Sequence, residues 1–239
     1  VSYLEITYSS KDGKKHNVEV KVQASEELCV NDPEGVEVEI EKVTVNKDIC
    51  GMKIGNKEQK PLNRSGDDIR IDWGYFYLTA KGKNIKTYTE RFEGLENIIV
   101  SASLEENKKQ MYYFAYDDVE SIEYFGKHLK SYWNKDGKTI LEAICEASED
   151  YEKVMLRCEE FSEKLFSDAV ESGGEKYAEL LSLAYRQVIA AHKLVLDENS
   201  DILYISKECF SNGCAATVDV SYPSIPMFLL YNPELVKGM

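Results

Sequence analysis

The sequence has little positive charge, few Gly or Pro residues, and no long hydrophobic run. Lys and Arg number 29 against 43 Asp and Glu, which gives a formal net charge of −14. This balance argues against binding to nucleic acid or to an anionic membrane surface, because both are held by clusters of cationic side chains. No apolar run approaches the ~18–20 residues that a membrane-spanning helix needs. With 43% hydrophobic residues, 14 Gly and 5 Pro among 239 residues, the composition is that of a globular chain.

Motifs of several common catalytic and metal sites are also missing. The chain has no G-x-S-x-G, P-loop, G-x-G-x-x-G or H-E-x-x-H motif. None of the six cysteines forms a C-x-x-C pair, and the three histidines are scattered, so we expect no metal and no cofactor. Cys145 and Cys158 fall within or beside the apolar stripe of a predicted helix, which favours free thiols over a disulfide framework. Free thiols in turn favour a reducing compartment or an anaerobic source.

The first 135 residues show the alternation of apolar and polar side chains that is typical of β-strands. Residues 4–8 and 18–22 alternate on either side of a turn at 11–14, which predicts an N-terminal hairpin. Further short alternating runs follow at 36–45, 69–77, 98–100 and 111–115. This pattern predicts an antiparallel β-sandwich over residues 1–135.

The period changes after Gly137. Apolar residues then recur every three or four positions from Ile140 to Leu165, and charged residues keep the same step on the other face. Gly173 and Gly174 interrupt this pattern, and a second apolar stripe runs from Tyr177 to Val195. We therefore predict two long helices over residues 138–196. On this prediction His192 lies near the apolar face of the second helix and packs in the core.

The last forty residues return to alternation and contain the strongest turn signal of the chain. Ile202–Tyr204 and Val218–Val220 are predicted strands on either side of Asn212-Gly213. Between and beside them lie polar side chains, among them Lys207, Glu208 and Asp219. Such a group either caps neighbouring loops or supplies an acid and a base from facing strands, and the two interpretations are equally supported.

A second polar group lies in the N-terminal half, at residues 66–74. It contains three carboxylates and one guanidinium, and Arg70 and Asp72 share one face of the strand predicted there. A surface ion pair in a turn is the simpler interpretation, and a ligand site is the alternative.

Several of these segments resemble the glutaminase A family. The resemblance rests on residues 183–187 (LAYRQ), 190–195 (AAHKLV), 206–213 (SKECFSNG), 217–224 (TVDVSYPS) and 228–233 (FLLYNP), and upstream on 66–75 (GDDIRIDWGY) and 115–118 (AYDD). It implies an α+β multidomain fold, in which an antiparallel β-sandwich is followed by the start of an (α/α)6 six-hairpin barrel. Residues 1–135 would be the later part of the sandwich domain, and 138–239 a linker helix with the first hairpin. Cys209 and Cys214-Ala215-Ala216 depart from the family pattern, which puts the exact substrate in doubt.

The resemblance also implies an activity, the hydrolysis of L-glutamine to L-glutamate and ammonia. For this reaction Asp219 is the expected base and Glu208 the expected acid, with Lys207, Asn212 and Tyr222 binding a small-molecule substrate. Two alternatives remain open: a six-hairpin glycoside hydrolase, which also uses two carboxylates, or a non-catalytic carbohydrate- or protein-binding module.

The two ends of the sequence suggest a piece of a longer protein. The chain begins at Val1, within an alternating pattern, and stops at Met239 just after an apolar stretch. On this interpretation most of the barrel lies beyond Met239, and the fragment alone is inactive. Its helices would expose an apolar stripe, so we also expect self-association.

Overall fold

The computed structural model describes residues 1–207 and 212–239. The chain divides into two compact units. The first unit contains Val1–Asn63, Arg70–Glu120 and Asp136–Ala147, and the second contains Arg64–Ile69, Ser121–Lys135 and Ser148–Met239. Each unit is therefore built from segments that are separated in the sequence.

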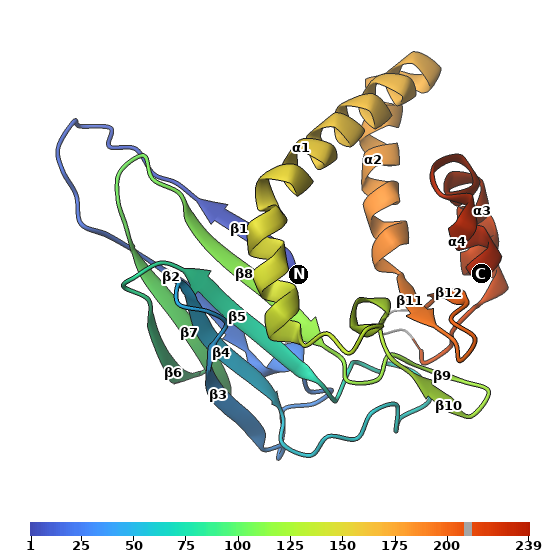
Figure 1. Ribbon diagram of the computed structural model, residues 1–239, viewed down its shortest axis with the longest axis horizontal. Helices are drawn as coiled ribbons and strands as arrows, with labels where there is room; N and C mark the ends of the chain where they lie inside the picture. The colour runs from blue at the N-terminus through green and yellow to red at the C-terminus, as the bar shows by residue number, and fades with distance from the viewer. Residues whose placement is uncertain (208–211) are drawn as a thin grey trace. The chain divides into compact units, whose positions relative to one another are not determined.

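Two antiparallel sheets form the first unit (Figure 1). The five-stranded sheet has the order β1-β8-β5-β4-β3, and the three-stranded sheet has the order β2-β7-β6. The strands are β1 (Ser2–Ile6), β2 (Val18–Ser25), β3 (Val38–Thr44), β4 (Ile49–Asn56), β5 (Tyr75–Lys81), β6 (Lys86–Phe92), β7 (Leu95–Leu104) and β8 (Gln110–Asp117). The predicted antiparallel β-sandwich is confirmed.

The core of this unit lies between the two sheets. Ile54 of β4, Leu78 of β5 and Tyr112 of β8 come from one sheet, while Ile98 and Val100 of β7 come from the other. All five side chains are fully buried. They alternate with residues of the opposite face along each strand, which is the pattern from which the strands were predicted.

The predicted N-terminal hairpin is wrong. β1 pairs with β8, and β2 pairs with β7, so the two strands belong to different sheets. Alternation in the sequence identifies a strand, but it does not identify the neighbour with which the strand pairs.

The predicted strand at residues 69–73 is wrong as well. Asp68 (φ 53°) and Gly74 (φ 84°) adopt left-handed backbone conformations that interrupt an extended chain.

Side-chain hydrogen bonds hold residues 70–74 in place of a strand ladder. The Asp72 carboxylate accepts the Asn31 N–H at 2.9 Å and the Asn56 side-chain amide at 3.2 Å. The indole N–H of Trp73 donates to the Asp118 carbonyl at 2.7 Å. Asp72 therefore serves as a hydrogen-bond acceptor for Asn31 and Asn56, a role that the sequence did not predict for the 66–74 group.

The helix α1 (Ile140–Gly173) starts with a capping box. The Thr139 hydroxyl accepts the Glu142 N–H at 3.3 Å, and the Glu142 carboxylate accepts the Thr139 N–H at 2.8 Å. Gly174 follows α1 with a φ of 84°, which glycine adopts without strain, and α2 (Glu175–Ala190) begins after it. The predicted glycine break between two amphipathic helices is thus confirmed.

The second helix ends earlier than predicted. His192–Leu196 form β11, which pairs with β12 (Ile202–Ser206). Val195 is fully buried in a small cluster with Ile122, Leu129 and Ile205. Its apolar spacing fits a helix and a strand equally well, so periodicity alone placed it on the wrong element. The short strands β9 (Ile122–Tyr124) and β10 (Lys127–Leu129) pair with each other in the same unit.

The predicted strand at Val218–Val220 is also wrong, because these residues begin the helix α3 (Val218–Tyr231). Ser224 and Phe228, four positions apart, are the buried residues of this helix, and α4 (Pro233–Gly238) follows it (Figure 1). A three-residue alternation is too short to distinguish the two periods. None of the helices in the described chain is long and apolar enough to cross a membrane.

Candidate functional site

Two polar segments that the sequence singled out separately meet in the second unit. Asp67 and Asn212 form an isolated antiparallel bridge, and the Gly213 N–H donates to the Gly66 carbonyl at 2.8 Å. The segment Arg64–Ile69 belongs to the second unit, although the chain on both sides of it belongs to the first. We call Arg64–Ile69 together with Asn212 and Gly213 the paired-turn site.

The backbone of the 64–69 turn requires unusual dihedral angles. Gly66 has a φ of 120° and Asp68 a φ of 53°. Glycine tolerates the first value because it has no Cβ, and aspartate is one of the residues that adopt the second most readily. A Cβ added at Gly66 would meet no atom within 4 Å, so the backbone conformation rather than lack of space favours glycine here.

The Asn212 side chain is fixed by its own turn. Its Oδ1 accepts the Cys214 N–H at 2.8 Å, which is the geometry of an Asx turn. Lys207 forms a bridge with Ala215, and the Ala216 N–H donates to the Ser206 carbonyl at 2.9 Å. The backbone from 212 to 216 is therefore tied to the end of β12, and the predicted substrate-binding Lys207 and Asn212 lie on neighbouring stretches of chain.

The predicted base, Asp219, lies in the first turn of α3 and is exposed. Negative charge interacts favourably with the helix dipole at this end of a helix. Tyr222 lies three residues further on and is 73% exposed, so the two side chains share the outer face of α3. Within the described part of the chain, Asp219 has no hydrogen bond or ion pair. The predicted acid, Glu208, lies outside the described residues.

A buried polar face of α3 was not found by sequence reasoning. The Ser221 and Ser206 hydroxyls lie 2.8 Å apart, and the Ser224 hydroxyl donates to the Ser221 carbonyl at 2.6 Å. Ser206 and Ser224 are both buried. The Ser206–Ser221 contact joins the first turn of α3 to β12, and Asp219 and Tyr222 lie on the opposite, exposed side of the helix.

His192 lies at the start of β11 rather than on the apolar face of a helix. It is directly opposite Ser206, and its Nδ1 donates to the Val188 carbonyl at 2.6 Å. Its ring stacks on Tyr204, with ring centroids 4.6 Å apart, and burial raises the pKa of Tyr204 to about 12. The Nε2 of His192 and the hydroxyl of Thr217 are buried without a hydrogen-bond partner among the described residues. His192 is thus a buried residue, as predicted, but its hydrogen bonding is only half satisfied in the described chain.

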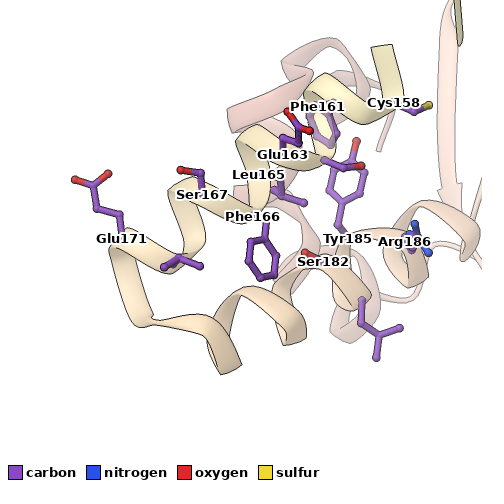
Figure 2. Close-up of a pocket in the computed structure, with 13 residues that line it drawn as sticks. Cys158, Phe161, Glu163, Leu165, Phe166, Ser167, Glu171, Ser182, Tyr185 and Arg186 are labelled. Carbon is purple, nitrogen blue, oxygen red and sulfur yellow. The ribbon is translucent and has the colours of Figure 1, made fainter. Parts of the chain in front are cut away.

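A groove of about 1110 Å³ lies between α1 and α2 (Figure 2). Figure 2 shows Phe166 and Tyr185 in the space between the two helices and Glu171 pointing away from it. Its lining is mostly apolar and contains none of the predicted site residues. Phe161 and Tyr185 contact each other with ring centroids 5.1 Å apart, and both contact Tyr231 of α3. The groove is therefore a packing surface distinct from the paired-turn site.

No group of three or more His, Cys, Asp or Glu side chains in the described chain is placed to hold a metal ion. The described cysteines, which exclude Cys209, are free thiols.

Two family models match the chain. Residues 1–103 and 96–168 match a domain of unknown function (DUF5127), and residues 174–239 match the glutaminase A six helical-hairpin domain. The chain belongs to the DUF5127 family, whose model matches most of its length, and its C-terminal part is similar to the six helical-hairpin domain of glutaminase A. The resemblance noted in the sequence is thereby confirmed.

Two curated relatives of this chain are fungal. Glutaminase A of Aspergillus oryzae is 24% identical across 99% of this chain, and the chain spans 39% of that protein. A probable glutaminase of Arthroderma benhamiae is 37% identical over 85 residues, which are 36% of this chain and 10% of that protein. No solved structure matches the chain.

Sequence reasoning marked both halves of the paired-turn site in this family member but did not pair them. Asp67 and Asn212 are far apart in the sequence, and no local signal indicates that two turns bond to each other. The local signals in the sequence were a Gly-Asp turn and an Asn-Gly turn, each with a group of polar residues beside it.

Proposed function

We propose that the protein containing this chain hydrolyses the side-chain amide of L-glutamine to L-glutamate and ammonia. The observation that carries the proposal is the match to curated relatives named glutaminase, one of them across nearly the whole chain. The grouping of Asp67 with Asn212 adds a polar surface of mixed character, which suits an amino-acid substrate.

Amide hydrolysis needs an activated nucleophile, stabilisation of the developing oxyanion, and a proton for the leaving ammonia. In the proposed reaction Asp219 takes a proton from water while the water oxygen bonds to the amide carbon. The C–N bond then breaks, and ammonia leaves with a proton from an acid. Glu208 remains the acid proposed from the sequence, and Lys207, Asn212 and Tyr222 the proposed substrate-binding groups.

Asp219 is the better supported of the two carboxylates. It is exposed to solvent and so can reach a water molecule, and it has no partner in the described chain that would occupy its oxygens. The helix that carries it is held by the Ser206–Ser221 contact. A fixed backbone and a free carboxylate are what a general base requires.

The test is release of ammonia by the whole protein that contains this chain. Glutamine, asparagine and a panel of aryl glycosides are supplied separately, and ammonia and free glycone are measured. We expect ammonia from glutamine and no cleavage of the glycosides. Glycoside cleavage without ammonia release would replace the proposal by the glycoside-hydrolase alternative, and no turnover of any substrate would favour a binding module.

A further inference from the structure

The paired-turn site places a carboxylate and a carboxamide side by side. Asp67 and Asn212 are directly opposite each other in an antiparallel bridge. Residues opposite each other in such a pairing direct their side chains to the same face, with Cβ atoms about 4.5–5.5 Å apart. A hydrogen-bond acceptor with negative charge thus lies beside a side-chain amide.

Both groups are available to a ligand. Asn212 uses its Oδ1 for the Cys214 N–H, which leaves the two N–H groups of Nδ2 directed away from that turn. Neither the Asp67 carboxylate nor Nδ2 of Asn212 has a hydrogen-bond partner in the described chain. Asp67 is exposed and Asn212 is half-buried, so the pair lies at the surface and not in the core.

We propose that Asp67 and Asn212 recognise the α-amino-acid end of the substrate, with the Asp67 carboxylate binding the α-ammonium and Nδ2 of Asn212 donating to the α-carboxylate. An α-amino acid presents one cation and one anion on a single carbon, which complements a negatively charged acceptor next to a neutral donor. The inference rests on the proposed function, since it assigns the specificity of that same reaction. It also separates an amino-acid amide from a glycoside, which carries neither charge.

The experiment measures binding by calorimetry in the whole protein, with two ligands that differ by one group. L-Glutamine carries the α-ammonium, and 4-carbamoylbutanoate keeps the carboxylate and the amide but lacks the ammonium. Asp67→Asn should weaken binding of glutamine about 10- to 100-fold, because it removes a charge-assisted hydrogen bond, and should leave binding of 4-carbamoylbutanoate unchanged. The matched control is Asp136→Asn, which removes the same charge from an exposed residue outside the site and should leave the binding of both ligands unchanged.

A second variant tests the other half of the pair. Asn212→Asp keeps an oxygen for the Cys214 N–H, so the turn is retained, but it replaces the donor by a negative charge. Asn212→Asp should weaken the binding of both ligands, because both carry the carboxylate.

Equal effects of Asp67→Asn on the binding of the two ligands, or no effect on the binding of glutamine, would overturn the inference. If the wild-type protein binds glutamine without releasing ammonia and Asp67→Asn still acts selectively, the inference holds and the proposed function fails; absence of glutamine binding overturns both.

Discussion

At the scale of single residues, two glycines that both have a positive φ differ in the space around them. Gly74 (φ 84°) and Gly66 (φ 120°) both adopt conformations that other residues rarely adopt. A Cβ at Gly74 would lie 2.4 Å from the Asp117 carbonyl oxygen, whereas a Cβ at Gly66 would meet nothing within 4 Å. Gly74 is therefore needed for both conformation and space, and Gly66 for conformation only.

We predict that Gly74→Ala lowers the free energy of unfolding by about 2–4 kcal/mol and Gly66→Ala by about 1 kcal/mol, because only the first adds a steric clash to the backbone strain. Urea denaturation of the two variants and the wild type, followed by circular dichroism, measures the difference. Losses of equal size would mean that the loop around Gly74 relaxes without cost.

The proposed base can be separated from a structural carboxylate by its effect on rate and stability. Asp219→Asn should lower kcat for glutamine by about 100-fold or more in the whole protein, because general-base catalysis contributes that much, and should leave the melting temperature nearly unchanged. The matched control is Glu175→Gln, which neutralises an exposed acid in the first turn of α2. A variant that keeps full activity, or that merely unfolds, would show that Asp219 is structural.

At the scale of elements, the sequence predicted which segments are strands and helices better than it predicted their partners. The alternation of residues 4–8 and 18–22 correctly indicated β1 and β2, but the eleven residues between the two strands carry the chain from one sheet to the other. Val195 and Val218 were placed on the wrong elements because three to five apolar residues fit either period. The capping box at Thr139 and the glycine at 174 are local signals, and the boundaries near them were close to those observed.

One short element gives a pH-dependent prediction. Glu26, in the 3-10 turn Glu26–Leu28, is 4% exposed, and its carboxylate accepts the Glu96 N–H of β7 at 3.1 Å. Burial raises the pKa of Glu26 above its unfolded value of 4.5. The folded state therefore holds this proton more tightly, so the stability that the group contributes is present below pH 4.5 and is lost as the pH rises through the folded pKa.

Glu26→Gln removes this titration and keeps an acceptor for the Glu96 N–H. We expect the variant to gain stability relative to the wild type as the pH rises from 4 to 7, measured as the difference in free energy of unfolding at each pH. Glu27→Gln, at the exposed neighbouring position, is the control for the loss of one negative charge and should produce a smaller change than Glu26→Gln. A flat difference for Glu26→Gln would show that water reaches this carboxylate in the folded state.

At the scale of the whole molecule, the change of period at Gly137 was sufficient to predict a β-sandwich followed by helices. The paired-turn site was predicted only in pieces, because its residues come from two turns that are far apart in the sequence and pair in the second unit. The pairing of these turns also explains why the two units alternate along the sequence: Arg64–Ile69 belongs to the second unit, whereas the segments before and after it belong to the first. Such long-range pairing depends on the total packing of the chain and has no signature in a local window.

Self-association of the chain remains a prediction, and the structure gives it a location. The groove between α1 and α2 is lined mainly by apolar side chains, and Leu180 and Leu183 on α2 are 64% and 54% exposed. Together with Phe166 and Tyr177, which are also exposed, they form an apolar surface on two adjacent helices. Surfaces of this kind mark interaction sites, and a second copy of the same chain is the occupant that we predict.

Sedimentation velocity of the 239-residue chain over a hundredfold range of concentration should show a concentration-dependent shift to a dimer. Leu183→Glu should weaken this association at least tenfold, because it places a charge in the apolar contact. Ser9→Glu adds the same charge at an exposed position of the first unit without changing the apolar surface of the helices, so it should leave the association unchanged. A monomer at every concentration would contradict the prediction, and equal effects of the two variants would show that net charge, rather than the apolar surface of the groove, governs the association.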